Sequence, residues 1–289
     1  MIEPIKNKNF YLQRILLYIF LTTLLIITIT PFLIMVITSF KTTDNIAGLR
    51  DILPSIETFK NFKISRETFK NYIEAWNDGM FGKYFYNTII VTLLVILGNL
   101  IFDTMVAYAL SRKEFYGKKL IFLFILARMM IPVQVLIIPV FILIKQLNLY
   151  DTLTALILPN VVQGFGIFLM KQYFDGIPKS LDEAAIIDGA SDFQILRYIL
   201  FPIAKPAIAV LIINTALSTW NIFLMPLILT QSVEKRVLGL GLALYKSQYG
   251  VDYVHSMAAS TIAVLPILIL FLCFQNYIVS GLTKGAVKT

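Results

Sequence analysis

Six apolar stretches of about 20 residues or more restrict the folds open to this chain more than any other feature. A helix of that length crosses the hydrocarbon of a bilayer, whereas barrel strands would show short, alternating segments. The composition agrees, with 58% hydrophobic and 15% charged residues, where a soluble domain has about a quarter charged. We therefore predict an all-α, polytopic membrane protein with the lipid bilayer as its first partner.

The six predicted spans belong to a single transmembrane domain, residues 1–289. They cover about 15–37, 85–110, 120–144, 153–174, 206–230 and 257–278. Lys6, Lys8 and Arg14 precede the first span, as in a signal peptide. That run is too long for one, and no small-x-small cleavage site follows, so we expect a retained anchor.

The distribution of basic residues predicts the orientation. With both termini cytoplasmic, the inner segments hold 13 Lys and Arg against 7 acids, and the outer segments 11 against 9. The tight loop 111–119, "SRKEFYGKK", holds four basic residues and is expected inside. Residues 38–84 then form an extracytoplasmic loop and 175–205 a cytoplasmic one. The net charge of +8 is thus assigned to topology, and we expect no nucleic-acid partner.

The cytoplasmic loop contains "SLDEAAIIDGASDFQILRYILFP", residues 180–202, a polar segment with helix signals. Ser180 with Glu183 forms a capping box, and Gly189 ends the first helix. Ser191 with Gln194 forms a second box. The second helix is expected to be amphipathic through the spacing of Phe193, Leu196, Ile199 and Leu200.

Two interpretations of this helical pair follow from the residues alone. It is either a folded loop that covers its own helix ends, or a docking element for another protein. A docking surface would be formed by the acids Glu183 and Asp188, with small residues that allow close approach. Those small residues are Ala184, Ala185 and Gly189.

The segment resembles the EAA loop of binding-protein-dependent ABC importer permeases. The residues that fit the pattern are Glu183, Ala184, Ala185, Gly189, Ile199 and Pro202, and Phe201 departs from the usual Leu. The resemblance implies the type I ABC importer permease fold, with this loop as coupling helices that dock in a cytoplasmic ATPase subunit. It implies that Glu183 faces a basic residue there.

Further motifs are similar to the carbohydrate (maltose and multiple-sugar) branch of these permeases. They are "NYIEAW", "FGKYFYNTIIVT", "AYALSR" and the C-terminal "GLTKGAVKT", in which Lys284 and Thr289 depart from the usual Ala and Gly. The resemblance implies that the tail reaches between ATPase subunits. The contacting residues would be Gly281, Lys284, Gly285 and Lys288; the alternative is a frayed polar terminus. The outer loop 231–256 would meet the solute-binding protein.

The chain lacks the phosphate-binding motif G-x-x-x-x-G-K-[ST]. We therefore expect no enzyme activity and no bound cofactor in this chain, with ATP and Mg²⁺ held by a separate ATPase chain. His255 is the one histidine, so neither a histidine-based metal site nor a Ser-His-Asp triad is available.

Polar residues inside the spans are candidates for function. Asp103 and Arg128 lie at similar predicted depth, and we predict an intramembrane ion pair. A sugar path needs hydrogen-bonding groups and an aromatic face. Its candidates are Asn214, Ser218, Trp220 and Asn221 in the fifth span, with Gln163 and Asn99 elsewhere. The alternative is hydrogen bonding between helices.

Together these features predict a permease subunit of an ATP-driven importer in the bacterial cytoplasmic (inner) membrane. Its substrate would be a sugar, a di- or oligosaccharide. The partners would be a second homologous permease, two ATPase subunits and an extracytoplasmic solute-binding protein. The alternatives are an importer of another solute, such as a polyol or glycerol phosphate, and an ATPase-independent channel or scaffold.

Overall fold

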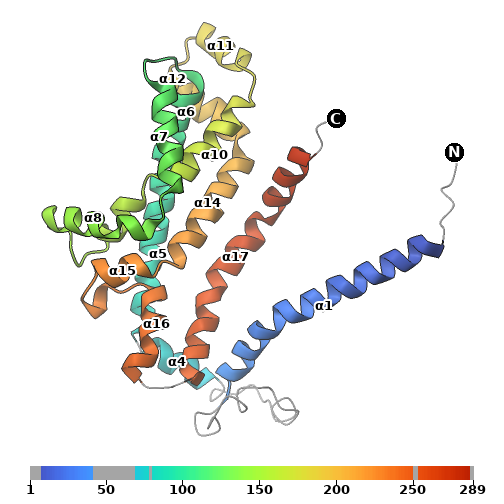
Figure 1. Cartoon of the computed structure of the whole chain (residues 1–289), viewed down its shortest axis with the longest axis vertical. Helices are drawn as coiled ribbons and strands as arrows, with labels where there is room; N and C mark the ends of the chain where they lie inside the picture. Colours follow the sequence, from blue (N-terminus) through green and yellow to red (C-terminus); the bar gives the residue numbers. More distant parts are fainter. Residues whose placement is uncertain (1–7, 42–68, 78–79, 250–252, 287–289) are drawn as a thin grey trace. The chain divides into compact units, whose positions relative to one another are not determined.

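The computed structural model describes residues 8–41, 69–77, 80–249 and 253–286, and in these residues all regular secondary structure is helical, without strands (Figure 1). Four helices are long and apolar enough to cross a membrane: Tyr11–Ser39, Phe81–Arg112, Thr154–Asp175 and Tyr253–Gln275. Two bent helix pairs raise the possible number to six. The predicted all-α class is confirmed.

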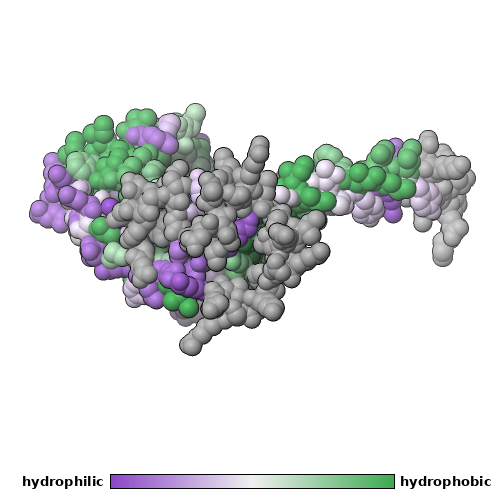
Figure 2. All heavy atoms as spheres, turned by 90° about the horizontal axis from the view of Figure 1, so that it is seen from below, coloured by the Kyte–Doolittle hydropathy of each residue, from purple (hydrophilic) through white to green (hydrophobic). Residues whose placement is uncertain are grey.

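The chain divides into two compact units, residues 1–79 with 245–262, and residues 80–244 with 263–289. In the first unit, α1 (Lys8–Ser39) exposes apolar side chains along its length, as a lipid-facing helix does (green in Figure 2). Its end is fastened to α4 (Lys70–Asn77), because Asn71 Nδ2 donates to the backbone oxygens of Ser39 and Lys41, each at 2.8 Å.

His255 also belongs to the first unit. It lies near the start of α17 (Tyr253–Ala286), with Nε2 3.1 Å from Oε2 of Glu74. This contact fixes α4 against the beginning of α17. The histidine therefore has a structural contact within its own unit.

The central helix of the second unit is continuous from Phe81 to Arg112. It consists of α5 (Phe81–Gly98), the π-helical turn η3 (Asn99–Asp103) and α6 (Thr104–Arg112). α14 (Lys205–Trp220) packs on α5 and α10 (Gly164–Asp175) on α6. Single π-turns inside α-helices are frequent at functional sites, and this one carries two buried polar residues, Asn99 and Asp103.

The third predicted span is not one straight helix. α7 (Lys118–Met130) and α8 (Val133–Gln146) meet at 105°, so the pair is a broken span or a re-entrant loop. The cause is Pro132, because a residue that precedes proline is disfavoured in the helical conformation. Ile131 accordingly adopts an extended ψ of 119°.

The fourth and fifth predicted spans are also interrupted. The fourth consists of α9 (Thr154–Ile157), η4 (Leu158–Asn160) and α10, with a break at 161–163. In the fifth predicted span, α14 ends at Trp220 and a second helix, α15 (Leu224–Leu229), follows after a short break. The elements before and after the fifth span are α11 (Ser180–Ile187), α12 (Asp192–Gln194), η5 (Ile195–Leu200), α13 (Phe201–Ile203), η6 (Val233–Lys235) and α16 (Leu238–Tyr249).

Two buried apolar clusters stabilise the second unit. One joins α6, α10 and the 180–211 region around Met170, Phe174 and Leu200. The other joins α5, α8 and α15 around Val95, Ile144 and Leu229. Between them the helices contact one another through polar side chains, and these contacts position the candidate site.

Candidate functional site

The first helix of the polar loop ends as predicted at Gly189. This residue has φ of +83°, and its N–H donates to Ile186 O at 3.0 Å while Ala190 N–H donates to Ala185 O at 2.9 Å. This pair of bonds is the Schellman motif, which satisfies the last carbonyl groups of a helix. Glu183 and Asp188 are therefore held at fixed positions on a closed helical turn.

Of the two predicted capping boxes, one is confirmed and one is wrong. Ser191 accepts from Gln194 N–H, and Gln194 Oε1 accepts from Ser191 N–H at 2.7 Å. Ser180, in contrast, is already helical and caps nothing. The turn begins one residue earlier, where Lys179 O accepts from Asp182 and Glu183 N–H, so the Ser180 side chain is in the wrong place to cap.

Glu183, Ala184, Asp188 and Gly189 are exposed on the loop, while Ala185 is buried beneath them. Two apolar neighbours on α11 are also exposed, Ile186 by 58% and Ile187 by 85%. Free apolar area of this size on a rigid polar loop is typical of a surface that a protein partner covers. We call the exposed residues of α11 and its end, 183–184 and 186–189, the docking face.

The opposite side of the loop is fastened to the C-terminal end of α6. Arg112 Nε lies 2.5 Å from Asp182 Oδ2, and Arg112 Nη2 donates to Ile177 O at 3.0 Å. Lys113 Nζ and the Tyr108 hydroxyl both contact Asp192 Oδ1, at 2.5 and 3.1 Å. One helix end thus holds both helices of the loop.

Sequence reasoning missed this attachment. The signal was present in two adjacent acids, Asp182 and Glu183, which point to different sides of α11: Asp182 is buried and Glu183 is exposed. Two basic residues at 112 and 113 offered the partners.

A second polar cluster lies where the spans are interrupted. Asn99 is fully buried; its Nδ2 donates to Asn160 O and its Oδ1 accepts from the Thr215 hydroxyl, each at 2.8 Å. Both ends of the amide are thus used between helices. Asn99 therefore joins η3, η4 and α14 and does not line a substrate path, contrary to prediction.

The predicted ion pair between Asp103 and Arg128 is wrong. Asp103 is fully buried, and its Oδ1 accepts from Gln163 N–H at 2.9 Å at the start of α10, where a helix dipole favours a negative group. Its Oδ2 has no hydrogen-bond partner and packs against Gly166, where any Cβ would overlap it. Arg128 is exposed on α7 and lines a separate pocket.

Trp220 is buried and does not fit its predicted role in a sugar path. It is 6% exposed, its Nε1 donates to Ala263 O at 3.1 Å, and its ring meets Phe85 edge-on at 5.6 Å between centroids. Its neighbours behave differently: Asn214, Ser218 and Asn221 are exposed and follow one face of the helix end. These three residues remain candidates.

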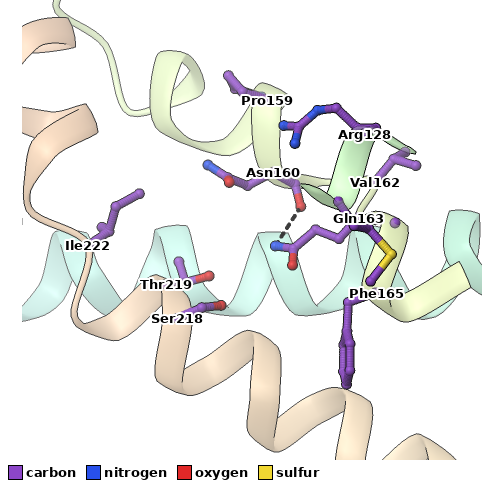
Figure 3. Close-up of a pocket in the computed structure, with 11 residues that line it drawn as sticks. Arg128, Pro159, Asn160, Val162, Gln163, Phe165, Ser218, Thr219 and Ile222 are labelled. Atoms are coloured by element: carbon purple, nitrogen blue, oxygen red, sulfur yellow. Dashed lines mark hydrogen bonds between the residues drawn. The ribbon is translucent and has the colours of Figure 1, made fainter. Parts of the chain in front are cut away.

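A pocket of about 350 Å³ lies among α7, η4, α10 and α14 (Figure 3). It is lined by Arg128, Met129, Pro159, Asn160, Val162, Gln163, Gly164, Phe165, Ser218, Thr219 and Ile222. Of the predicted path residues it contains Gln163, whose Nε2 donates to Asn160 O at 3.4 Å, and Ser218. The interruption of the fourth span is what opens this space, because residues 161–163 leave the helix there.

The segment before α16, residues 231–236, is fastened by the side chains of Asp151, Ser232 and Asn87. Asp151 accepts from Gln231 and Ser232 N–H at 2.8 and 2.9 Å and from the Ser232 hydroxyl. Asn87 Nδ2 donates to the carbonyl groups of Glu234 and Arg236. Burial acts to raise the pKa of Asp151, but the hydrogen bonds from Ser232 and Gln231 outweigh it, and this pKa lies below its ordinary value.

Of the predicted tail contacts, Gly281, Lys284 and Gly285 fall within α17. Their side chains lie outside the described part of the chain, as does all of Lys288.

Comparison with known proteins places these features in context. The family model described as binding-protein-dependent transport system inner membrane component matches residues 104–284. The arabinooligosaccharides permease protein AraQ of Bacillus subtilis is 39% identical over 222 residues, 76% of this chain and 79% of the relative. The trehalose/maltose permease protein MalG of Thermococcus litoralis is 36% identical over 228 residues, 77% and 82% of the two chains.

A third relative and a solved structure are also components of transport systems. The diacetylchitobiose permease protein NgcG of Streptomyces coelicolor is 35% identical over 76% of this chain and 74% of its own length. A crystal structure of a bacterial ABC transporter involved in import of the acidic polysaccharide alginate covers 96% of this chain and 100% of its own, with a TM-score of 0.80 and 26% identity. The chain therefore belongs to the family of binding-protein-dependent transport system inner membrane components, multi-pass proteins of the inner membrane.

Proposed function

We propose that this chain is a permease subunit of an ABC importer that moves a di- or oligosaccharide from a solute-binding protein into the cytoplasm. Named relatives transport arabinooligosaccharides, diacetylchitobiose, and trehalose or maltose, all of them sugars. Family membership brings an ATPase and a solute-binding protein as partners. The family is not catalytic, because separate ATPase chains hydrolyse the ATP.

The complete assembly in this proposal has two homologous permeases and two ATPase subunits that bind ATP and Mg²⁺, with both termini of this chain cytoplasmic. The observation that carries it is the docking face. It presents an exposed acid and bare apolar area on a helix whose other side is fixed to α6 through Arg112 and Asp182. Because this surface is fixed to α6, a movement of the bound ATPase would be transmitted to the spans.

The sugar path in the proposal runs past Gln163 and Ser218 in the pocket and past the exposed face formed by Asn214 and Asn221. Together these side chains offer hydroxyl and amide groups to sugar hydroxyls. The tail residues Gly281, Lys284, Gly285 and Lys288 are proposed to contact the ATPase subunits.

The first test is co-purification of the ATPase with this permease. Glu183→Lys reverses the charge on the docking face and is expected to abolish co-purification. Glu114→Lys is the matched control, because Glu114 is an acid in the neighbouring loop with an 81% exposed side chain. Retention of the ATPase by Glu183→Lys would contradict docking through this face.

The second test identifies the solute class. The complex in proteoliposomes, with its binding protein, is offered maltose, trehalose, an arabinooligosaccharide, diacetylchitobiose, a polyol and glycerol phosphate. We expect ATPase stimulation by one of the sugars. If only the polyol or glycerol phosphate stimulates the ATPase, the solute is not a sugar.

A further inference from the structure

Arg128 is a cation near the end of α7, in a segment apolar enough to enter the membrane, and the described residues give it no partner. It lies ten residues along α7 from Lys118, about 15 Å at 1.5 Å per residue. Among the residues that the structure describes, its guanidinium makes neither an ion pair nor a hydrogen bond. A charged side chain within a span is costly and is found facing a cavity or a compensating group. The cavity is present here, since Arg128 lines the pocket.

The other walls of the pocket carry hydrogen-bonding groups and no carboxylate. Ser218 uses its hydroxyl hydrogen on Thr215 O at 3.0 Å, so its oxygen is left to accept. Asn160 uses its Nδ2 on Leu156 O at 2.8 Å, which leaves its amide oxygen to accept. Figure 3 shows Arg128 beside η4, with Ser218 and Thr219 on α14 across the pocket.

The nearest candidate acid is not available to Arg128. Asp103 lies behind the pocket wall, where its Oδ1 is bound by Gln163 N–H and its Oδ2 is enclosed by Gly166 and Leu211. The pocket therefore combines one positive, donor-only side chain with acceptor groups, Asn160 beside it on η4 and Ser218 across the pocket on α14. Its volume of about 350 Å³ falls within the range of small-molecule sites, roughly 300–1,000 Å³.

We infer that this pocket binds the saccharide in transit, with Arg128 donating to its oxygen atoms and Ser218 and Asn160 accepting from its hydroxyl groups. The inference rests on the proposed function and adds to it a recognition residue. Sugar hydroxyls both donate and accept, which matches a pocket that offers both kinds of group. A guanidinium is suited to the task, because its planar fork donates to two neighbouring oxygens at once.

The experiment measures uptake of radiolabelled maltose and an arabinooligosaccharide by the reconstituted complex for Arg128→Gln and Arg128→Lys. Lys119→Gln is the control, because it removes the same charge from the exposed inner end of the same helix. We expect Arg128→Gln to lower uptake about tenfold or more, as loss of charge-assisted hydrogen bonds does. Arg128→Lys should be intermediate, since it keeps the charge without the fork, and the control should stay close to wild type.

Assembly is measured on the same samples by co-purification of the second permease and the ATPase. Wild-type assembly with reduced uptake supports the inference. Loss of the second permease in Arg128→Gln would instead assign Arg128 to a carboxylate of that subunit, and unchanged uptake would also overturn the inference. A defect seen only in vesicles with anionic lipid would assign Arg128 to a lipid phosphate. Failure of the proposed function itself is distinguishable, because the wild-type complex would then take up neither sugar.

Discussion

Arg112 Nε lies 2.5 Å from Asp182 Oδ2, with both side chains buried, and this ion pair joins the C-terminal end of the central helix to the polar loop. The side chains are 5% and 11% exposed, so neither charge is well solvated. Removing one member of a buried pair leaves the other uncompensated, which costs about 3–5 kcal/mol. The pair is therefore a strong constraint on the loop.

We predict that Arg112→Gln loosens the loop and lowers the thermal stability of the purified protein. Lys113→Gln is the comparison, because Lys113 and Asp192 pair with side chains 44% and 56% exposed, and such pairs contribute about 1 kcal/mol or less. Limited proteolysis of residues 175–205 and thermal unfolding in detergent provide the measurements. If the double variant with Arg112→Asp and Asp182→Arg partly recovers thermal stability, charge pairing is the cause. Equal losses of stability in Arg112→Gln and Lys113→Gln would contradict this explanation.

A second prediction concerns Gly166. A Cβ there would overlap Asp103 Oδ2 and approach Leu211 Cδ1 to 2.8 Å, so Gly166→Ala should destabilise the protein by about 1–3 kcal/mol. Gly176→Ala, at the end of the same helix, meets its nearest atom at 3.4 Å and should cost much less. Thermal unfolding of both variants makes the test. Equal losses would show that helix conformation, rather than the Asp103 contact, determines the effect.

A third prediction concerns Gly189, whose φ of +83° is disfavoured for residues with a Cβ. A Cβ at this position would have no atom within 4 Å, so Gly189→Ala acts through backbone conformation alone, at about 1–2 kcal/mol. Asn tolerates this conformation better, and Gly189→Asn should cost less. Amide hydrogen exchange over residues 180–190 should be faster in the Ala variant than in the Asn variant. Equal protection in the two would contradict this account.

A fourth prediction follows from Asp151, whose pKa in the folded protein lies below the ordinary 3.8. The folded state therefore favours the ionised form, and the stability from this group is fully present above pH 3.8. It is lost as the pH falls through the lower, folded pKa. The amide protection factors of residues 230–236, which correct for the intrinsic exchange rate at each pH, should fall in acid for the wild type. The fall should be smaller for Asp151→Asn, which has no charge to lose.

Much of the fold was predictable because the relevant signals are local. The apolar runs located the membrane segments, and Gly189 and Ser191 marked where helices stop and start. The bend at Pro132 was not predicted, because residues 120–144 were predicted as one span. The direction taken by α8 depends on its contacts with α5 and α15.

The candidate site was less predictable, because depth in a membrane does not tell which way a side chain points. Asp103 and Arg128 both lie in helical segments, as predicted, but Asp103 contacts the start of α10 whereas Arg128 lines the pocket. Trp220 looked like a stacking platform and proved to be a packing residue, held by Ala263 and Phe85. Only the three-dimensional contacts separate these roles.

The π-helical turn at Asn99–Asp103 makes the two halves of the central helix independent in register. In an α-helix each residue turns the chain by about 100°, so inserting or deleting one residue on either side rotates everything beyond it. The wider turn absorbs such a step while keeping the axis continuous. As a result the N-terminal half directs Asn87 and Thr88 to residues 234–238. The C-terminal half directs Arg112 to the polar loop, in a register that differs from that of the first half by the extra residue of the π-turn.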